Sequence, residues 1–387
     1  MNNSFTLITL YIIAFAGFTS FSWLFPVIPY YASGLGLSVA DTGIIVSIYS
    51  YVNAIGIIPA GIISDRWGRR TFLVIGLIIS TLSPFLYPLA RDIVTLNLVR
   101  ILHGLGSALF IPTALAVVTD ISSDGEHGKS IGWYSLSAQL GLMAGPMAGG
   151  FILEHFGFEA AFYTCSLTPL LALIFVSTRM HALPHIPKHK NLDAGNSWQW
   201  LADRGAIISI VSLIMIAIGS SAVSTFIPLY VHQFGISEAG AGMIITSCYI
   251  SSAALRVPSG LMADKYGNAP LIFIGVIICA AGIGLISAFH TLIALAVVTL
   301  IFGAGMGLSM PAALSWLAQL SPPDKRGLSM GLGSAAFQVG LALGSTVLGM
   351  VTENNGFTTM YLSAGSVIAL SALFILVAYK YGNRSAA

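Results

Sequence analysis

Long apolar runs separated by short polar loops dominate the hydrophobic pattern of this chain. Twelve runs reach about 20 residues, the length at which an α-helix crosses a hydrocarbon core of about 30 Å. Because backbone groups inside a bilayer must be satisfied internally, and barrel strands would be about half as long, the runs predict membrane-spanning helices. The predicted spans are residues 6–31, 41–63, 71–90, 94–119, 129–154, 159–178, 205–232, 239–263, 270–289, 292–319, 328–352 and 357–380.

The composition supports this interpretation. Hydrophobic residues make up 56% of the chain and charged residues only 8%, against about 25% charged residues in ordinary soluble domains. The first run has no small-residue cleavage site, so we expect a retained helix and no signal peptide. The expected fold class is an all-α polytopic membrane protein with 12 transmembrane helices in two pseudo-symmetric six-helix bundles.

The basic residues predict the orientation of the chain. With a cytoplasmic N-terminus, thirteen of the 16 Lys and Arg residues fall in cytoplasmic loops and ends, and only Arg91 falls in an outer loop. This bias favours cytoplasmic positions for both termini, in a multi-pass protein of the cell (cytoplasmic or inner) membrane. The net charge of +2 reflects the same loop asymmetry and gives no indication of nucleic-acid binding.

The chain contains an internal repeat of two copies. A shift of 199 residues pairs, without a gap, Gly36 with Gly235, Gly68 with Gly267, Gln139 with Gln338, Glu154 with Glu353 and Gly157 with Gly356. Each copy carries six predicted spans, so both copies have the same orientation in the membrane. We therefore expect an N-terminal bundle at 1–178, a cytoplasmic linker at 179–204 and a C-terminal bundle at 205–387.

Some sequence patterns resemble those of enzymes and metal sites, but the surrounding sequence does not fit such sites. "GLSMG" at 327–331 matches a nucleophile motif but opens a membrane helix, and "SDGEHGKS" at 123–130 lacks the first glycine and the strand of a phosphate-binding loop. Prolines interrupt the linker histidines His181, His185 and His189. The three cysteines lie in different spans, where packing is expected. We predict no enzyme activity, no catalytic residues, no metal and no cofactor.

Four motifs in order carry a family resemblance. "GIISDRWGRR" at 61–70 resembles the loop between helices 2 and 3 of the major facilitator superfamily, and "GLMADKYGNA" at 260–269 resembles its weaker second copy. "RILHGLG" at 100–106 resembles the helix 4 motif, and "GLMAGPMAGG" at 141–150 the helix 5 antiporter motif. The chain resembles the 12-helix drug:proton antiporter (DHA1-like) group of that superfamily.

The resemblance implies roles for these residues. The loop motif would form a conformational latch on the cytoplasmic side, and Asp120 would supply the acidic partner of Arg69. From the residues themselves, we expect close helix approach at Gly61, a tight turn at Gly68, and a smooth ridge for helix packing at every fourth position from Gly141. The latch set is Gly61, Asp65, Arg66, Gly68, Arg69, Arg70, Asp120 and Asp264, and the antiporter motif is Gly141, Gly145, Pro146, Gly149 and Gly150.

Few charges lie within the spans. Arg100 and Arg256 are each costly in a bilayer, so we expect both to face a central cavity and to have partners; the alternative for both is snorkelling to an interface. Polar and aromatic residues near mid-span are further candidates for the wall of a substrate cavity, although aromatic residues in spans more often serve packing. These candidates are Asn53, Gln139, Gln338, Trp23, Tyr49, Tyr249 and Phe337.

The chain departs from the proton-coupled multidrug members in one respect. Those members usually carry an acidic residue inside the N-terminal spans, whereas every carboxylate here falls at a helix end or in a loop. The remaining titratable candidates for proton coupling are His103, Asp41 and Asp120. A structural role for His103 stays an equal alternative.

The predicted function is secondary active transport by alternating access, in the form of a proton-coupled exporter of small organic molecules or drugs. An organic-anion uniporter or symporter, with Arg100 and Arg256 binding the substrate, is an alternative, and so is a lipid or amphiphile exporter. The expected partners are a small-molecule substrate, the proton and the lipid bilayer, for a monomeric protein that binds no nucleic acid.

Overall fold

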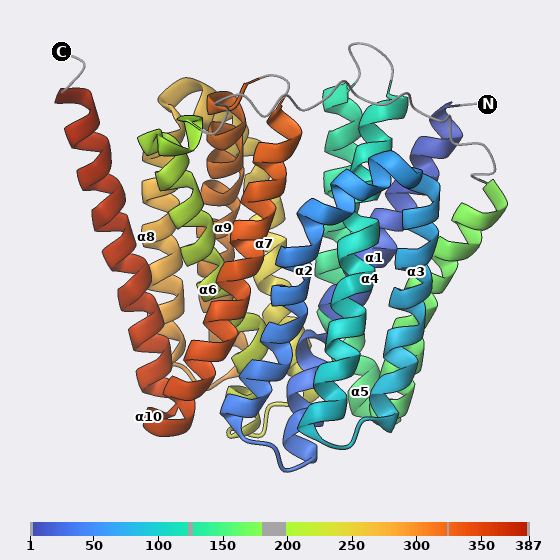
Figure 1. The fold of residues 1–387 in the computed structure, drawn as a ribbon. Helices are drawn as coiled ribbons and strands as arrows, with labels where there is room; N and C mark the ends of the chain where they lie inside the picture. Colours follow the sequence, from blue (N-terminus) through green and yellow to red (C-terminus); the bar gives the residue numbers. More distant parts are fainter. Residues whose placement is uncertain (1–2, 123–126, 180–198, 323–324, 385–387) are drawn as a thin grey trace. The chain divides into compact units, whose positions relative to one another are not determined.

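The computed structural model describes residues 3–122, 127–179, 199–322 and 325–384 (Figure 1). Within these ranges the chain forms α-helices, two short 3-10 helices, η1 (Tyr87–Leu89) and η2 (Gln199–Ala202), and no strand. The expected all-α fold class is confirmed. The α-helices are α1 (Asn3–Gly34), α2 (Val39–Trp67), α3 (Arg69–Leu86), α4 (Ile93–Ile121), α5 (His127–Arg179), α6 (Arg204–His232), α7 (Glu238–Tyr266), α8 (Asn268–Ile286), α9 (Leu292–Leu320) and α10 (Arg326–Arg384).

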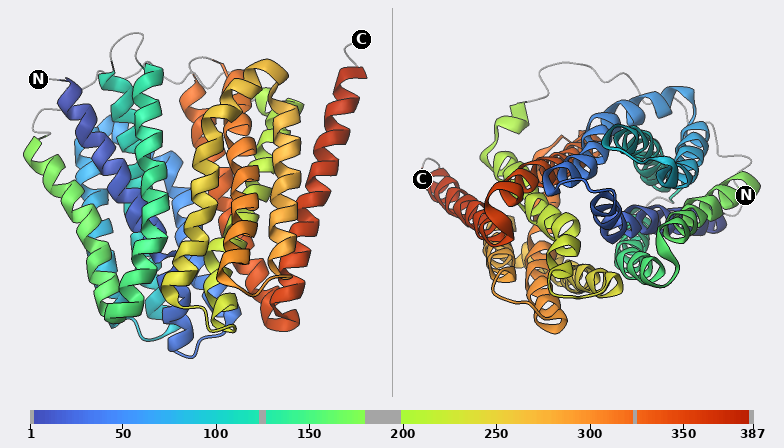
Figure 2. Two further views of the ribbon diagram at one scale, coloured as in Figure 1. Left: turned by 180° about the vertical axis from the view of Figure 1, so that it is seen from behind. Right: turned by 90° about the horizontal axis from the view of Figure 1, so that it is seen from below.

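Two of these helices are pairs of helices joined at a glycine. The backbone leaves the helical conformation at Gly157 in α5 (φ 80°) and at Gly356 in α10 (φ 80°), and Figures 1 and 2 show α10 turning back on itself. All ten described α-helices are long and apolar enough to cross a membrane. With α5 and α10 divided at their glycines, the described residues supply the twelve predicted spans.

The repeat is visible in the backbone. Every described residue with a positive φ is a glycine, and the six fall into three pairs at the repeat offset of 199 residues. These pairs are Gly36 with Gly235, Gly68 with Gly267 and Gly157 with Gly356. Because L-residues with a side chain rarely adopt this conformation, glycine is required at equivalent turns of both copies.

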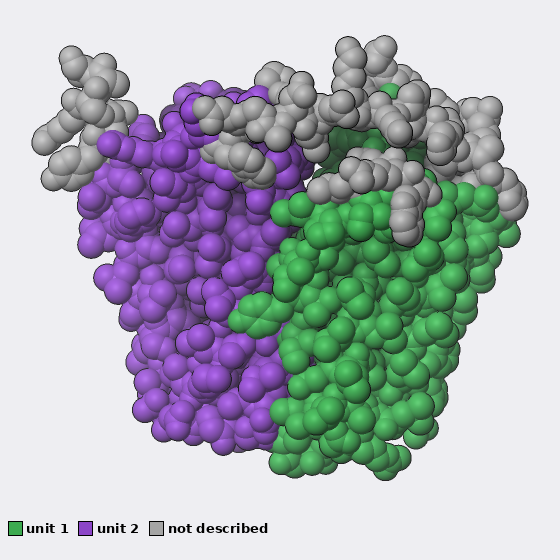
Figure 3. All heavy atoms as spheres, viewed as in Figure 1, with its two compact units in different colours: residues 1–37, 48–190, 237–246 green, residues 38–47, 191–236, 247–387 purple. Residues whose placement is uncertain are grey.

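Contacts divide the chain into two compact units (Figure 3). Unit 1 comprises Met1–Leu37, Ile48–Lys190 and Ser237–Thr246, and unit 2 comprises Ser38–Ser47, Asn191–Ile236 and Ser247–Ala387. Each unit therefore contains a short piece of the other repeat: the start of α7 lies in unit 1, and the start of α2 in unit 2. The linker boundary stays a prediction, because residues 180–198 lie outside the described part of the chain.

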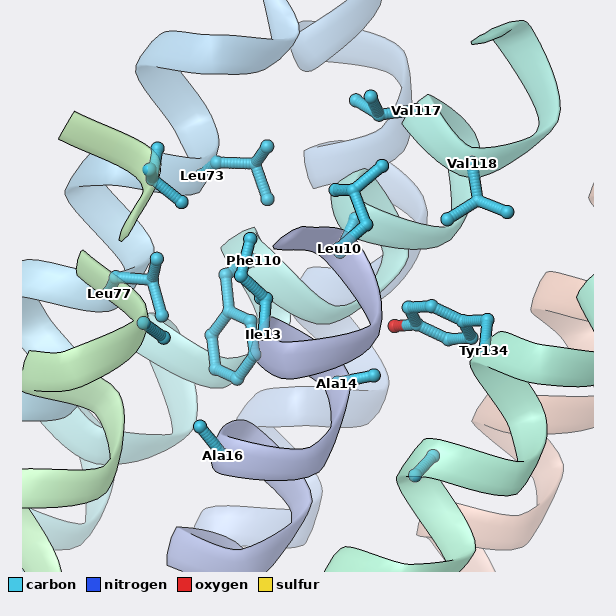
Figure 4. Close-up of a cluster of buried hydrophobic side chains, with 14 of the residues drawn as sticks. Leu10, Ile13, Ala14, Ala16, Leu73, Leu77, Phe110, Val117, Val118 and Tyr134 are labelled. Carbon is cyan, nitrogen blue, oxygen red and sulfur yellow. The ribbon is translucent and has the colours of Figure 1, made fainter. Parts of the chain in front are cut away.

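The core of unit 1 joins four of its helices (Figure 4). Leu10 and Ile13 of α1, Leu73 of α3 and Phe110 of α4 are buried together with Tyr134 of α5. The Tyr134 hydroxyl donates a hydrogen bond to the backbone carbonyl of Ile111 at 3.2 Å. Since lipid is as apolar as these side chains, tight packing rather than water exclusion stabilises such a core.

The glycine ridge packs as the sequence predicts. A Cβ added to Gly141, Gly145 or Gly149 of α5 would collide with backbone or side-chain atoms of α1 between Phe15 and Trp23. Ser22 of α1 also donates a hydrogen bond to the Gly141 carbonyl at 3.1 Å. In unit 2, Gly340 and Gly344 of α10 approach α6 in the same way. Small residues thus allow each pair of helix backbones to touch.

Candidate functional site

Arg100 of α4 lies within a buried aromatic cluster in unit 1. Its side chain is only 5% exposed. The guanidinium carbon lies 4.8 Å from the centre of the Tyr49 ring, and Nη1 donates a hydrogen bond to the Tyr87 hydroxyl at 3.4 Å. A cation over an aromatic face is stabilised by the ring quadrupole, so aromatic groups of the protein itself stabilise this buried charge.

His103 belongs to the same cluster. It is buried, its Nδ1 lies 3.3 Å from the Tyr87 hydroxyl, and its ring meets Tyr49 edge-on at 5.4 Å between centroids. Hydrogen bonding to Tyr87 is the role that the geometry gives His103.

The cluster combines candidates that the sequence supplied with one that it did not. Asn53 donates a hydrogen bond to the Ser107 hydroxyl at 2.9 Å, and Tyr49 stacks on Phe21 of α1 at 5.2 Å. The sequence does not single out Tyr87, which lies inside the predicted span 71–90 like other aromatic residues in spans. Pro88 stands at the start of η1, and the Tyr87 hydroxyl contacts Arg100 and His103 of α4.

Arg256 lies on α7 in unit 2, within the span. Its Nη2 is 3.9 Å from the sulfur of Met310 on α9, and its buried Nε has no hydrogen-bond partner among the described residues. Tyr249 lies seven residues earlier on the same helix, about two turns away and on nearly the same side of it. The surroundings of Arg256 thus differ from the aromatic cluster around Arg100.

The other cavity candidates differ in burial. Trp23 is buried and donates from Nε1 to the Ala161 carbonyl at 2.9 Å, which is a packing role. Gln139 is 3% exposed, whereas its repeat mate Gln338 and the neighbouring Phe337 are partly exposed.

The predicted ion pair of the latch is present. Arg69 Nη1 at the start of α3 lies 2.7 Å from Asp120 Oδ2 near the end of α4, and both side chains are mostly buried. Gly68 adopts φ 96° between α2 and α3, which confirms the tight turn. The expected close approach at Gly61 is wrong, because an added Cβ there would meet no described atom within 4 Å.

The rest of the latch set gives less information. Arg70 is partly buried and Asp264 is exposed. The side chains of Asp65 and Arg66 lie outside the described residues, as do the linker histidines His181, His185 and His189.

Two glutamates, equivalent in the repeat, bind the starts of helices from the opposite copy. Glu154 Oε2 of α5 accepts a hydrogen bond from the backbone N–H of Ala239 in α7 at 3.0 Å. Glu353 Oε2 of α10 accepts bonds from Val39 and Ala40 in α2 at 3.0 and 3.3 Å. Both carboxylates therefore cap a helix N-terminus, where negative charge is favourable.

Close backbone contacts support these twin caps. A Cβ on Gly242 of α7 would meet the Pro146 carbonyl of α5, and one on Gly43 of α2 would meet the Ser345 carbonyl of α10. Asp41 also serves this region, since its carboxylate accepts from the Ser38 N–H at 3.2 Å while Ser38 Oγ accepts from the Asp41 N–H at 3.1 Å. This reciprocal pair is a capping box at the start of α2.

Ser329, the serine of the nucleophile-like motif, has a structural role. Ser329 is buried, donates to the Arg326 carbonyl at 2.9 Å and accepts from the Ser321 hydroxyl at 3.1 Å. Residues 123–126 of the loop-like motif lie outside the described part of the chain. Cys165, Cys248 and Cys279 are free and buried, as expected for packing residues.

Comparison with a family model identifies the family of the chain. The model described as Major Facilitator Superfamily matches residues 10–204 and 209–386, nearly the whole chain. The chain belongs to the major facilitator superfamily. It is a multi-pass membrane transporter and not an enzyme, and the prediction from the four motifs is confirmed.

Curated relatives of this superfamily transporter match along most of their length. An uncharacterised MFS-type transporter of Methanocaldococcus jannaschii is 24% identical over 373 residues, covering 95% of each chain. Multidrug resistance protein 2 of Bacillus subtilis is 26% identical and covers 96% of this chain and 95% of its own. A probable sugar efflux transporter of Pasteurella multocida is 26% identical, with 91% and 87% covered.

Solved structures share the fold at lower identity. A point mutant of the peptide transporter POT superposes with a TM-score of 0.80 at 17% identity, covering 97% of this chain and 94% of its own. The human organic anion transporter MFSD10 has a TM-score of 0.69 at 16% identity, with 97% and 100% covered. These similarities confirm the superfamily fold.

Proposed function

We propose that this superfamily transporter is a proton-coupled exporter of small organic molecules that works by alternating access. Residues 1–178 and 205–387 rock against each other around a central substrate site, in a monomer with both termini in the cytoplasm. The name of the relative multidrug resistance protein 2 of Bacillus subtilis supports export of organic molecules. The observation that carries the mechanism is the twin set of caps at Glu154 and Glu353.

The caps support alternating access because they join the two repeats through a few polar bonds. Each cap consists of a carboxylate from one repeat and backbone N–H groups from the other, on the side that the basic residues predict to be outside. Such bonds can exchange for water when the outer ends separate, at a small net cost. In our proposal the caps form when the outer side closes and break when it opens.

Transport in proteoliposomes with an imposed pH gradient tests the proposal. We expect flux of organic solutes that follows the gradient and stops when an ionophore collapses it. Flux that ignores the gradient would contradict proton coupling and leave the transporter assignment intact.

Three single variants locate the proton carrier. We expect Asp120→Asn to abolish pH-driven flux, because protonation of Asp120 would break its ion pair with Arg69. Solute exchange measured in the absence of a pH gradient should persist at the reduced rate expected from loss of this pair. His103→Gln and Asp41→Asn should retain coupling, since these residues serve a buried hydrogen bond and a helix cap. Coupling lost in His103→Gln alone would move the carrier to the aromatic cluster.

A charge exchange separates the ion pair from proton carriage. We expect Arg69→Ala to lower the transport rate about tenfold, since a charge-assisted contact is lost. The double variant Arg69→Asp, Asp120→Arg should recover solute exchange if pairing alone matters, without recovering pH-driven flux. The measurement is the initial rate under both conditions, and full recovery of both would exclude Asp120 as the carrier.

A further inference from the structure

We propose that Arg256 binds a negatively charged group of the transported molecule, so that organic carboxylates are preferred substrates. The inference rests on the proposed function in one respect, namely that the bound molecule is also the one transported. Of the two arginines within the spans, the proposal gives substrate binding to Arg256 and excludes Arg100 from that role.

The first argument is the set of donors around Arg256. A guanidinium carries five N–H donors and no acceptor. Among the described residues, the Nε has no acceptor, and Nη2 faces only the Met310 sulfur at 3.9 Å, which is a weak acceptor. No described carboxylate forms an ion pair with Arg256. A planar carboxylate matches the terminal Nη1 and Nη2 donors of such a fork.

The second argument is the face of α7 on which Arg256 lies. At about 100° per residue, Arg256 is within roughly 60° of Tyr249, Ser252 and Ser259 around the helix. Ser252 and Ser259 are fully buried, and Ser259 donates to the Leu308 carbonyl of α9 at 2.7 Å. This face therefore packs toward α9.

The exposed apolar side of α7 is elsewhere on the helix. Ile250, Val257 and Leu261 are 45%, 74% and 69% exposed, and they lie about 100° to 140° from Arg256. A side chain that snorkels along the lipid surface would belong among them. Arg256 is instead partly accessible beside Met310, as a ligand-binding group requires.

Arg100 provides the contrast within the same chain. Its charge lies over the Tyr49 ring and against the Tyr87 hydroxyl, and the side chain is 5% exposed. Both of these partners are part of the protein. A cation in a span needs compensation, and at Arg100 the fold supplies it, whereas at Arg256 the compensating group is left to the substrate.

Three compounds with one ring system test the inference: 1-naphthylacetate, its amide, and 1-naphthylethylamine. In proteoliposomes containing the full chain, we expect kcat/KM for the carboxylate to exceed that for the amide at least about tenfold. Arg256→Gln should remove this preference by lowering carboxylate transport alone, and Arg256→Lys should restore part of it. Arg256→Met, which suits an apolar span, repeats the test if the Gln variant does not fold. Arg91→Gln, at an exposed loop arginine, is the control with the same charge change.

The outcomes separate this inference from the proposed function. Equal transport of carboxylate and amide, unchanged in Arg256→Gln, would overturn the anion preference and leave the transporter proposal standing. If none of the compounds crosses, thermal denaturation decides: a carboxylate-induced rise in Tm in the wild type but not in Arg256→Met supports the site while counting against transport of these compounds. No such rise in the wild type would overturn the site.

Discussion

Replacing both Glu154 and Glu353 with alanine is expected to open the predicted outer side of the transporter. Each glutamate caps a helix start of the opposite repeat, and loss of a cap changes an equilibrium by about fivefold. Because the two caps act at separate sites, their effects should multiply to about 25-fold in the double variant. The population of the outward-closed state relative to the outward-open state would then fall by this factor.

Spin labels at Ser33 and His232 measure this change. These positions are exposed and equivalent in the two repeats, while the three native cysteines are buried and will not compete for the label. We expect the distance distribution between the labels to shift to longer values in each single variant and further in the double variant. High salt should reduce the difference, since it screens charge at the caps.

Glu159→Ala is the matched control for the caps. Glu159 is an exposed carboxylate on α5, five residues after Glu154, so its removal changes the net charge by the same amount as each single cap variant. Its distance distribution should match that of the wild type. A double cap variant that also matches the wild type would show that the glycine contacts alone hold the outer ends, and the role proposed for the caps would be wrong.

The caps also show where prediction from the sequence stops. Glu154 and Glu353 were visible as repeat mates, but their partners lie 85 and 314 residues away along the chain. No local pattern connects a carboxylate at one helix end with the N–H groups of a distant helix. The repeat predicts that both contacts exist once one is known, because Ala40 and Ala239 are themselves 199 residues apart.

Local and periodic signals were more informative. The length of the apolar runs predicted the spans, and glycine positions predicted the turns at Gly68 and the ridge on α5, because span length and close approach depend on residues that are near in sequence. The Arg69–Asp120 pair came from family resemblance rather than from spacing. Which side of α4 or α7 carries its arginine into polar surroundings depends on packing with other helices, so Arg100 and Arg256 could not be told apart beforehand.

Gly145→Ala is expected to lower both the stability of the transporter and the yield of folded protein. The added Cβ would collide with Ser22 Oγ and lie 2.6 Å from the Thr19 carbonyl oxygen and 2.7 Å from the Trp23 nitrogen. Two of these atoms are backbone, so α1 and α5 must separate rather than one side chain rotate. Overpacking of this kind costs about 1–3 kcal/mol or more, against a gain of about 1 kcal/mol for alanine over glycine in a helix.

Gly132→Ala isolates the packing effect, because it makes the same change on the same helix at a position where an added Cβ meets no atom within 4 Å. The repeat supplies a second pair for the same comparison, Gly344→Ala beside Ser221 and Gly331→Ala in open space. We expect the variants at Gly145 and Gly344 to lower the Tm in detergent and the yield of monodisperse protein, while those at Gly132 and Gly331 keep or raise the Tm. Equal stability across all four would show that the helices yield at these contacts, so that the antiporter motif serves movement between the helices rather than a fixed seal.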